Sequence, residues 1–148
     1  MTVKAEFRIL GDDFHPDDIT KRLGIQPLAQ WEKGEVIKGK DRARSYSCWE
    51  IATGYEESWD VNDQLSKVAR IVRDKKAELR ALREQLDGLD YRFEVVVKIE
   101  NGDVPAVHLE SDMIELANEI EAVFAFDIYA NPYPERPIME EGPKRHVD

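Results

Sequence analysis

Apolar and polar residues alternate along the first segment of the chain. Within residues 3–10, Phe7 and Ile9 occupy odd positions, whereas Lys4 and Arg8 occupy even ones. Such alternation is typical of a strand with one buried face and one polar face. We therefore predict a strand over residues 3–10 that carries its charged side chains on one side.

The pattern then changes to a short helix followed by an irregular hairpin. Residues 16–23 begin with a proline, which suits the first turn of a helix, and Gly24 follows as a left-handed cap. Two strand-like pieces, residues 31–37 and 46–52, flank a polar segment that contains glycine. This arrangement predicts a hairpin with a long connection.

A long amphipathic helix is predicted over residues 61–86. Its apolar positions are spaced three, four or seven residues apart and form one stripe: Leu65, Val68, Val72, Leu79, Leu82 and Leu86. The stripe is interrupted at Lys75. A straight helix of this length would be longer than a small domain is wide, so we expect a bend near residues 74–76 or a projecting end.

The last third alternates again and completes the fold prediction. Residues 91–100 read as a strand, and Asn101-Gly102 is a strong hairpin-turn signal. A strand at 104–109, a helix at 112–122 and a strand at 123–129 follow. The order β-α-β-β-α-β-β-α-β predicts an α+β fold with a largely antiparallel sheet and helices on one face.

Length and composition favour one domain with a tail. Residues 1–130 are predicted to form a single α+β domain, because the length of 148 residues matches one core. Residues 131–148 hold four of the seven prolines and no apolar period. We expect that tail to be extended or disordered.

The net charge limits the classes of binding partner, and the cysteine content bears on the cellular location. The net charge of −10 opposes binding to nucleic acid or to a membrane surface, since both are anionic. The single cysteine, Cys48, has no partner for an internal disulfide, and the start of the chain lacks a long apolar run. These features favour a cytoplasmic location.

No recognisable catalytic or metal-binding pattern occurs in the sequence. The three histidines, His15, His108 and His146, lack ligand spacing, and Cys48 has no neighbouring histidine or second cysteine. Phosphate-binding and hydrolase motifs are also missing. We therefore expect no cofactor and no metal, and lean against an enzyme.

One candidate site combines aromatic and basic residues. Trp31, Arg44 and Trp49 fall in the region with the highest concentration of both. If they share a face, they could stack on a planar ligand or a peptide and pair with its anionic groups. The alternative is that the two tryptophans belong to the core of the sheet, where aromatic residues are common.

A second candidate site is acidic. Residues 99–130 contain eight acidic residues and no Lys or Arg. Within the predicted helix, Asp112, Glu115 and Glu119 lie at i, i+3 and i+7 and therefore form one stripe. Such a stripe is usually only a solvated face, but it could also attract a basic protein partner.

The sequence resembles a bacterial family catalogued as domain of unknown function 4279. The similarity rests on residues 14–27 after the opening strand, Trp31 with Lys33-Gly34, Trp49 in its strand, and the closing residues 126–129. It covers roughly residues 5–130. The resemblance implies a stand-alone bacterial domain and carries over no functional residue.

Three functional hypotheses follow. The first is a non-enzymatic binding or interaction protein that presents its acidic surface to a basic partner. The alternative is a domain that binds a small molecule or peptide in a Trp/Arg-lined pocket. A third is a homo-oligomer formed through the apolar stripe of residues 61–86, which could pair with its own copy.

Overall fold

The computed structural model describes residues 1–130 as one sheet with a layer of helices. The predicted tail, residues 131–148, lies outside the described residues. The elements in chain order are β1 (Thr2–Gly11), α1 (Pro16–Leu23), β2 (Ala29–Trp31), β3 (Ser47–Ala52), β4 (Glu56–Glu57), α2 (Asn62–Asp74), α3 (Lys76–Gln85), β5 (Asp90–Ile99), α4 (Ser111–Ile120) and β6 (Ala122–Ala130).

The six strands form a largely antiparallel sheet, which confirms the predicted α+β class. Its order is β2-β3-β1-β5-β6, and the short β4 also pairs with β1. Every pairing is antiparallel except that of β5 with β6. The parallel pair arises because β5 and β6 are joined by a crossover through α4, which returns the chain to the same end of the sheet.

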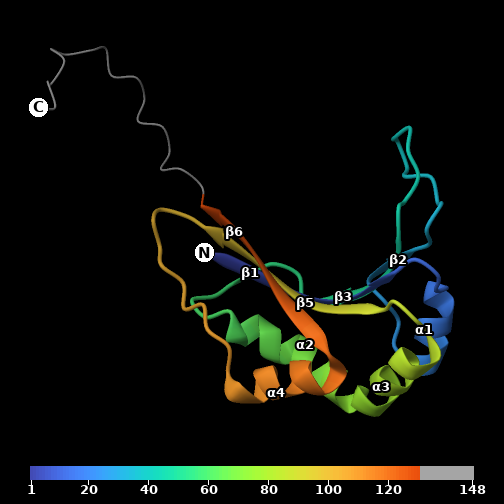
Figure 1. Ribbon diagram of the computed structural model, residues 1–148. Helices are drawn as coiled ribbons and strands as arrows, with labels where there is room; N and C mark the ends of the chain where they lie inside the picture. The colour runs from blue at the N-terminus through green and yellow to red at the C-terminus, as the bar shows by residue number, and fades with distance from the viewer. Residues whose placement is uncertain (131–148) are drawn as a thin grey trace, which may run out of the picture.

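All four helices lie on one side of the sheet (Figure 1). The odd residues of β1 that alternate in the sequence, such as Phe7 and Ile9, are buried against this layer. Phe7 packs on Tyr91 and Phe93 of β5, with ring centroids 5.8 and 5.1 Å away. The core therefore occupies the space between one face of the sheet and the helices.

Helix α1 begins and ends as the sequence predicts. Pro16 occupies its first turn, and Gly24 caps it in the left-handed conformation with φ of 66°. Thr20 on this helix accepts a hydrogen bond of 3.0 Å from the indole nitrogen of Trp49. The helix thus covers the β3 part of the sheet and satisfies the polar atom of a buried tryptophan.

The predicted long helix is divided into α2 and α3. The break is at Lys75, whose φ of −111° and ψ of 16° leave the helical region. The bend keeps both halves of the apolar stripe, from Leu65 to Leu82, against the sheet. That stripe belongs to the core of the domain and is not exposed for pairing with a second copy.

The predicted strand at residues 104–109 is absent. Asn101 and Gly102 do form a turn, with φ values of 55° and 72°, but the segment beyond it makes only an isolated bridge from Ala106 to Asp60. The physical reason is that both edges of β5 are already occupied, one by β1 and the other by β6. A hairpin partner has no free edge to join.

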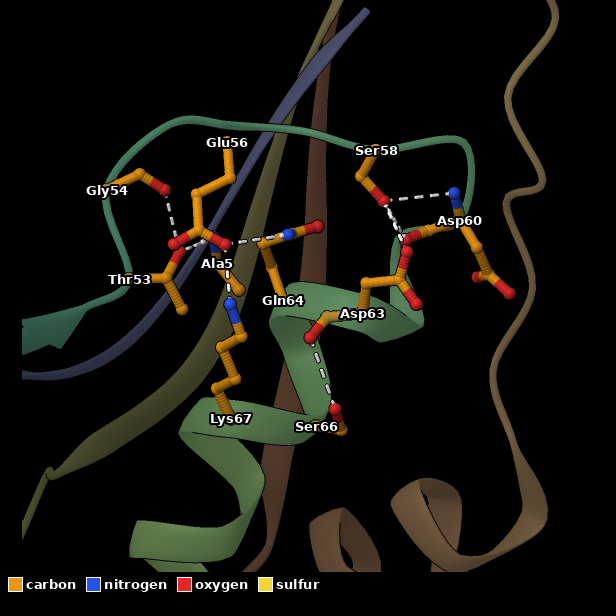
Figure 2. Close-up of polar contacts among 10 residues, drawn as sticks. All are labelled: Ala5, Thr53, Gly54, Glu56, Ser58, Asp60, Asp63, Gln64, Ser66 and Lys67. Atoms are coloured by element: carbon orange, nitrogen blue, oxygen red, sulfur yellow. Dashed lines mark hydrogen bonds and ion pairs between the residues drawn. The ribbon is translucent and has the colours of Figure 1, made fainter.

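A network of polar contacts fixes the entry to α2 (Figure 2). The Ser58 hydroxyl donates to an Asp63 carboxylate oxygen at 2.7 Å and accepts from the backbone N–H of Asp60 at 3.2 Å. Nearby, Glu56 accepts from Lys67 at 2.5 Å. These bonds tie the first turns of α2 to β4 and to the loop that follows it, and so replace a conventional side-chain cap.

Among the helices of residues 1–130, none is both long and apolar enough to cross a membrane.

Candidate functional site

The face of the sheet opposite the helices carries an array of charged side chains. The even residues of β1 lie there, together with the alternate residues of β3 and β5 that pair beside them. The charged members of this face are Lys4, Glu6, Arg8, Glu50, Asp90, Arg92, Glu94 and Lys98. We call this surface the open face, because no described helix covers it (Figure 1).

Arg8 is the centre of the charges on the open face. Its Nε lies 2.9 Å from a Glu50 carboxylate oxygen, and its NH1 lies 3.3 Å from both carboxylate oxygens of Glu94. The Nε contact is an ion pair without hydrogen-bond geometry. All three side chains are only 16% exposed, so solvent screens these interactions less than it would on an open surface.

The strand register places like charges directly opposite each other on this face. Arg8 faces Arg92, and Glu6 faces Glu94, an arrangement that is unfavourable for neighbouring side chains. Diagonal and local contacts compensate for it: Arg8 reaches Glu94, and Arg92 pairs with Asp90 at 2.8 Å. The charged side chains therefore form one connected network, in which ion pairs offset the repulsion between like charges.

Burial and mutual contact alter the protonation of this network. Burial disfavours the charged form of Arg8, but the neighbouring Cys48, Glu94 and Glu50 outweigh it and raise the pKa of the guanidinium. Burial raises the pKa of Glu50, and the nearby Glu6 raises it further, although Arg8 opposes both effects. Arg8 is thus permanently charged, whereas Glu50 holds its proton more tightly than an ordinary glutamate.

Trp31 lies at one end of the open face, close to two guanidinium groups. The Arg44 guanidinium carbon is 4.1 Å from the centroid of the Trp31 ring, and that of Arg8 is 5.8 Å away. Tyr46 adds a tilted aromatic contact with centroids 6.1 Å apart. The indole nitrogen of Trp31 is buried and has no hydrogen-bond partner within residues 1–130.

Residues 32–46 form a ribbon that rises from this end of the sheet on the side away from the helices (Figure 1). Its two arms are joined by backbone hydrogen bonds, including Gly34 to Arg44 at 2.9 Å and Arg44 to Glu35 at 2.7 Å. A cavity of about 360 Å³ lies within it, lined by Ile37, Arg42, Ala43, Arg44, Ser45 and Tyr46. The ribbon carries five basic and three acidic residues, so it has a net positive charge although the chain as a whole is acidic.

Cys48 lies on the open face beside Trp31, with which it is paired in the register of β2 and β3. Its sulfur is 3.6 Å from an Arg8 nitrogen. Burial raises the pKa of this thiol to about 11 even though the positive charge of Arg8 acts in the opposite direction. The thiol is therefore protonated at neutral pH and is not an activated nucleophile.

A second aromatic and basic group occupies the other end of the open face. The Tyr55 ring has the ammonium groups of Lys98 at 4.0 Å and Lys4 at 4.8 Å from its centroid. Lys4 also pairs with Glu6 at 2.6 Å. The open face therefore has an aromatic ring with cations at each end and the Arg8 network between them.

The structure brings two of the three predicted ligand-binding residues together and separates the third. Trp31 and Arg44 are in contact, but Trp49 is fully buried on the helix side of the sheet. The register explains this, because Trp31 pairs with Cys48 while Trp49 pairs with Gln30, so the two indoles point to opposite faces. Trp49 is a core residue, as the alternative interpretation of the sequence proposed.

The predicted acidic stripe is partly neutralised by neighbouring helices. Asp112 lies 3.7 Å from Arg73 of α2, and Glu119 forms an ion pair with Lys76 of α3. Glu115 is exposed and makes no ion pair within the described part of the chain. The segment from 99 to 130 is acidic along the sequence, but the tertiary structure places basic residues against two of its three stripe positions.

Sequence reasoning missed the residues that organise the charges of the open face: Arg8, Glu50 and Glu94. The available signal was the presence of opposite charges at the middle of three separate strand patterns. That signal becomes a site only when the order of the strands is known, because β1 must lie between β3 and β5 for Arg8 to reach both glutamates.

No metal centre is built from these residues. Within residues 1–130, no group of three or more His, Cys, Asp and Glu side chains is arranged to hold a metal ion. His15 instead pairs with Glu32, with 3.0 Å between the ring nitrogen and the carboxylate oxygen, and this contact raises the pKa of the histidine.

The sequence profile of one family matches all of the described residues. The family described as domain of unknown function (DUF4279) matches residues 1–131. The chain belongs to this family. Searches among curated proteins and among solved structures gave no match.

Proposed function

We propose that this chain is a binding domain that takes a planar or extended anionic ligand at the Trp31 end of the open face. The observation that carries the proposal is the stack of Arg44 on Trp31, 4.1 Å from guanidinium carbon to ring centroid, beside the cavity of the basic ribbon. Stacking on an aromatic ring leaves the guanidinium nitrogens free to pair with an anion.

The charges around the stack favour an anionic ligand over a cationic one. The carboxylates of the open face near Trp31, Glu50 and Glu94, are already paired with Arg8. Arg42 and Arg44 line the cavity, and no acidic side chain does. A flat anion could extend the stack from Trp31 to Tyr46 while these two guanidiniums bind its charged group.

Two matched probes test the proposal directly. Naphthalene-2-sulfonate and naphthalen-2-ylmethylammonium share one ring system and differ in the sign of their charge. We expect the sulfonate to bind more tightly, as measured by isothermal titration calorimetry and by the NMR shift of the Trp31 indole N–H. The Trp31→Ala and Arg44→Ala variants should each weaken sulfonate binding about tenfold or more.

Trp59→Ala is the matched control. Trp59 is 64% exposed and lies in the loop before α2, so its removal takes away an exposed indole elsewhere on the surface. Equal binding by the Trp31→Ala variant and the wild type would overturn the proposal. So would a preference for the ammonium probe.

A second candidate function, an acidic surface for a basic protein partner, is supported by Glu115. Its carboxylate is exposed and unpaired among the described residues, and Asp112 and Glu119 lie on the same helix. We expect Glu115→Lys combined with Glu119→Lys to weaken binding of an oligolysine peptide, with a strong dependence on salt. Unchanged binding would exclude this surface.

The proposal also includes a cellular location. A cytoplasmic location stays a prediction that rests on the single cysteine, Cys48, and it is tested by fractionating cells that express the chain with an epitope tag.

A further inference from the structure

The two edges of the sheet are protected very differently. At one edge, β2 has only three residues, and the chain then leaves the sheet in the ribbon of residues 32–46. At the other edge, β6 has nine residues and pairs only with β5 within residues 1–130. Figure 1 shows β6 along this outer border of the sheet. Short strands and interruptions prevent edge-to-edge pairing, and β6 has neither.

The composition of β6 suits a strand that is paired on both sides. Its nine residues include one charged residue, Asp127, and no Pro, Gly or Lys. Three of its apolar or aromatic side chains are about half exposed: Val123 at 48%, Ile128 at 52% and Tyr129 at 56%. A long apolar edge strand of this kind is a template for a further strand.

Helix α4 extends the apolar character of the same edge. Asp112 and Glu119 contact α2 and α3 through Arg73 and Lys76. Ile114 lies roughly 150° around the helix from these acids, because each residue turns an α-helix by about 100°. The Ile114 side chain, 52% exposed, therefore points away from α2 and toward the edge that β6 forms.

We propose that β6 pairs antiparallel with β6 of a second copy of this chain, so that two sheets join into one across a two-fold axis. An axis at Phe126 gives a consistent register. Phe124 then faces Ile128 of the second copy, and Val123 faces its Tyr129. Both are pairs of an aromatic with a β-branched residue, which stabilise neighbouring strands. A two-fold interface of this kind uses the same surface on both copies.

The distribution of charge is compatible with a second copy despite the net charge of −10. In the register centred on Phe126, Asp127 faces Ala125 of the second copy, so the two Asp127 carboxylates are not directly opposed. Glu121, just before the strand, lies 3.9 Å from Arg83 of its own chain. The paired acids of α4 face α2 and α3 rather than this edge.

The experiment is the mass of the full chain in solution, measured by sedimentation equilibrium and light scattering from low to high micromolar concentration. The proposal predicts twice the mass of 17.1 kDa at high concentration. Val123→Lys and Ile128→Lys, made separately, should each raise the dimer dissociation constant at least about tenfold, because each places two new charges in the interface.

Leu28→Lys is the control, since Leu28 is 69% exposed next to β2 at the opposite edge. It should leave the dissociation constant unchanged. Far-UV circular dichroism checks the fold of each variant, and either β6 variant alone carries the test if the other does not fold. A single-chain mass at every concentration would overturn the proposal, and so would a dimer that neither lysine weakens.

Discussion

The two faces of the sheet are built from the same strands, yet they differ in almost every physical property. On β1, Phe7 and Ile9 point into a closed apolar core, while Lys4 and Arg8 point to the open face. The helix side is covered by four helices, and no described helix covers the other side. The first face is stabilised by removal of apolar area from water and the second by contacts among charges.

The comparison teaches that an uncovered face is not the same as a solvated one. Glu50, Glu94 and Arg8 are each only 16% exposed, although no described helix is packed over them as on the other side of the sheet. Their long side chains cover one another and the backbone of the sheet. The ion pairs of the open face should therefore matter more for stability than ordinary surface pairs do.

The largest expected effect comes from breaking the apolar face. Phe7→Ala should lower the free energy of unfolding by about 3 to 5 kcal/mol, because it removes a buried ring that contacts Tyr91 and Phe93. Urea denaturation measures this change. Lys98→Ala, on the open face, is the control and should cost less than about 1 kcal/mol. Similar costs for both variants would remove the distinction between the faces.

A smaller effect is expected from removing the central cation of the open face. Arg8→Met should cost about 2 to 4 kcal/mol, since it leaves Glu50 and Glu94 partly buried without their countercharge. The same denaturation experiment measures it. A triple variant that also carries Glu50→Gln and Glu94→Gln should recover part of the loss. A cost for Arg8→Met of only a few tenths of a kcal/mol would mean that the network is fully screened.

The pH dependence of stability also tests whether the charged side chains of the open face are partly buried. The folded chain raises the pKa of Glu50 above its ordinary value, mainly through burial. The contribution of this group to the free energy of unfolding is therefore greatest at low pH and is lost as pH rises from about 4.5 through the folded pKa. Glu50→Gln removes that loss, so its stability relative to wild type should improve as the pH rises from about 4 to 7. A difference that stays constant with pH would contradict the shift.

The smallest effect on stability is expected at Cys48. The pKa of its thiol is about 11 because burial outweighs the adjacent Arg8 charge, so almost no thiolate is present at neutral pH. Reaction with 5,5′-dithiobis(2-nitrobenzoate) should be slow in native buffer and fast in urea. Cys48→Ala should change the free energy of unfolding by about 1 kcal/mol or less. Rapid modification of the native protein would show that this part of the open face is accessible.

Much of the fold could be predicted from local patterns. The alternation in residues 3–10, the helix between Pro16 and Gly24, and the break at Lys75 all appear where the sequence places them. These features depend on neighbours within a few residues. A strand face, a helix cap and an interrupted apolar stripe are local consequences of side-chain and backbone geometry.

The failures share one cause, which is dependence on strand pairing. Residues 104–109 look like a strand, but β5 has no free edge to receive them. Trp31 and Trp49 look like one aromatic group, but the register of β2 on β3 sends them to opposite faces. A shift of one residue in that register would reverse the result, and nothing local determines it.

The sequence by itself determined the α+β class, the family and the alternation that gives β1 one apolar and one charged face. Only the tertiary structure decided that β1 lies between β3 and β5, that Arg44 stacks on Trp31, and that basic residues of α2 and α3 meet the acidic helix. The physical reason is the distance along the chain over which each kind of interaction acts. Periodicity and caps act along a few residues of chain, whereas ion pairs and stacking join side chains that only the assembled sheet brings together.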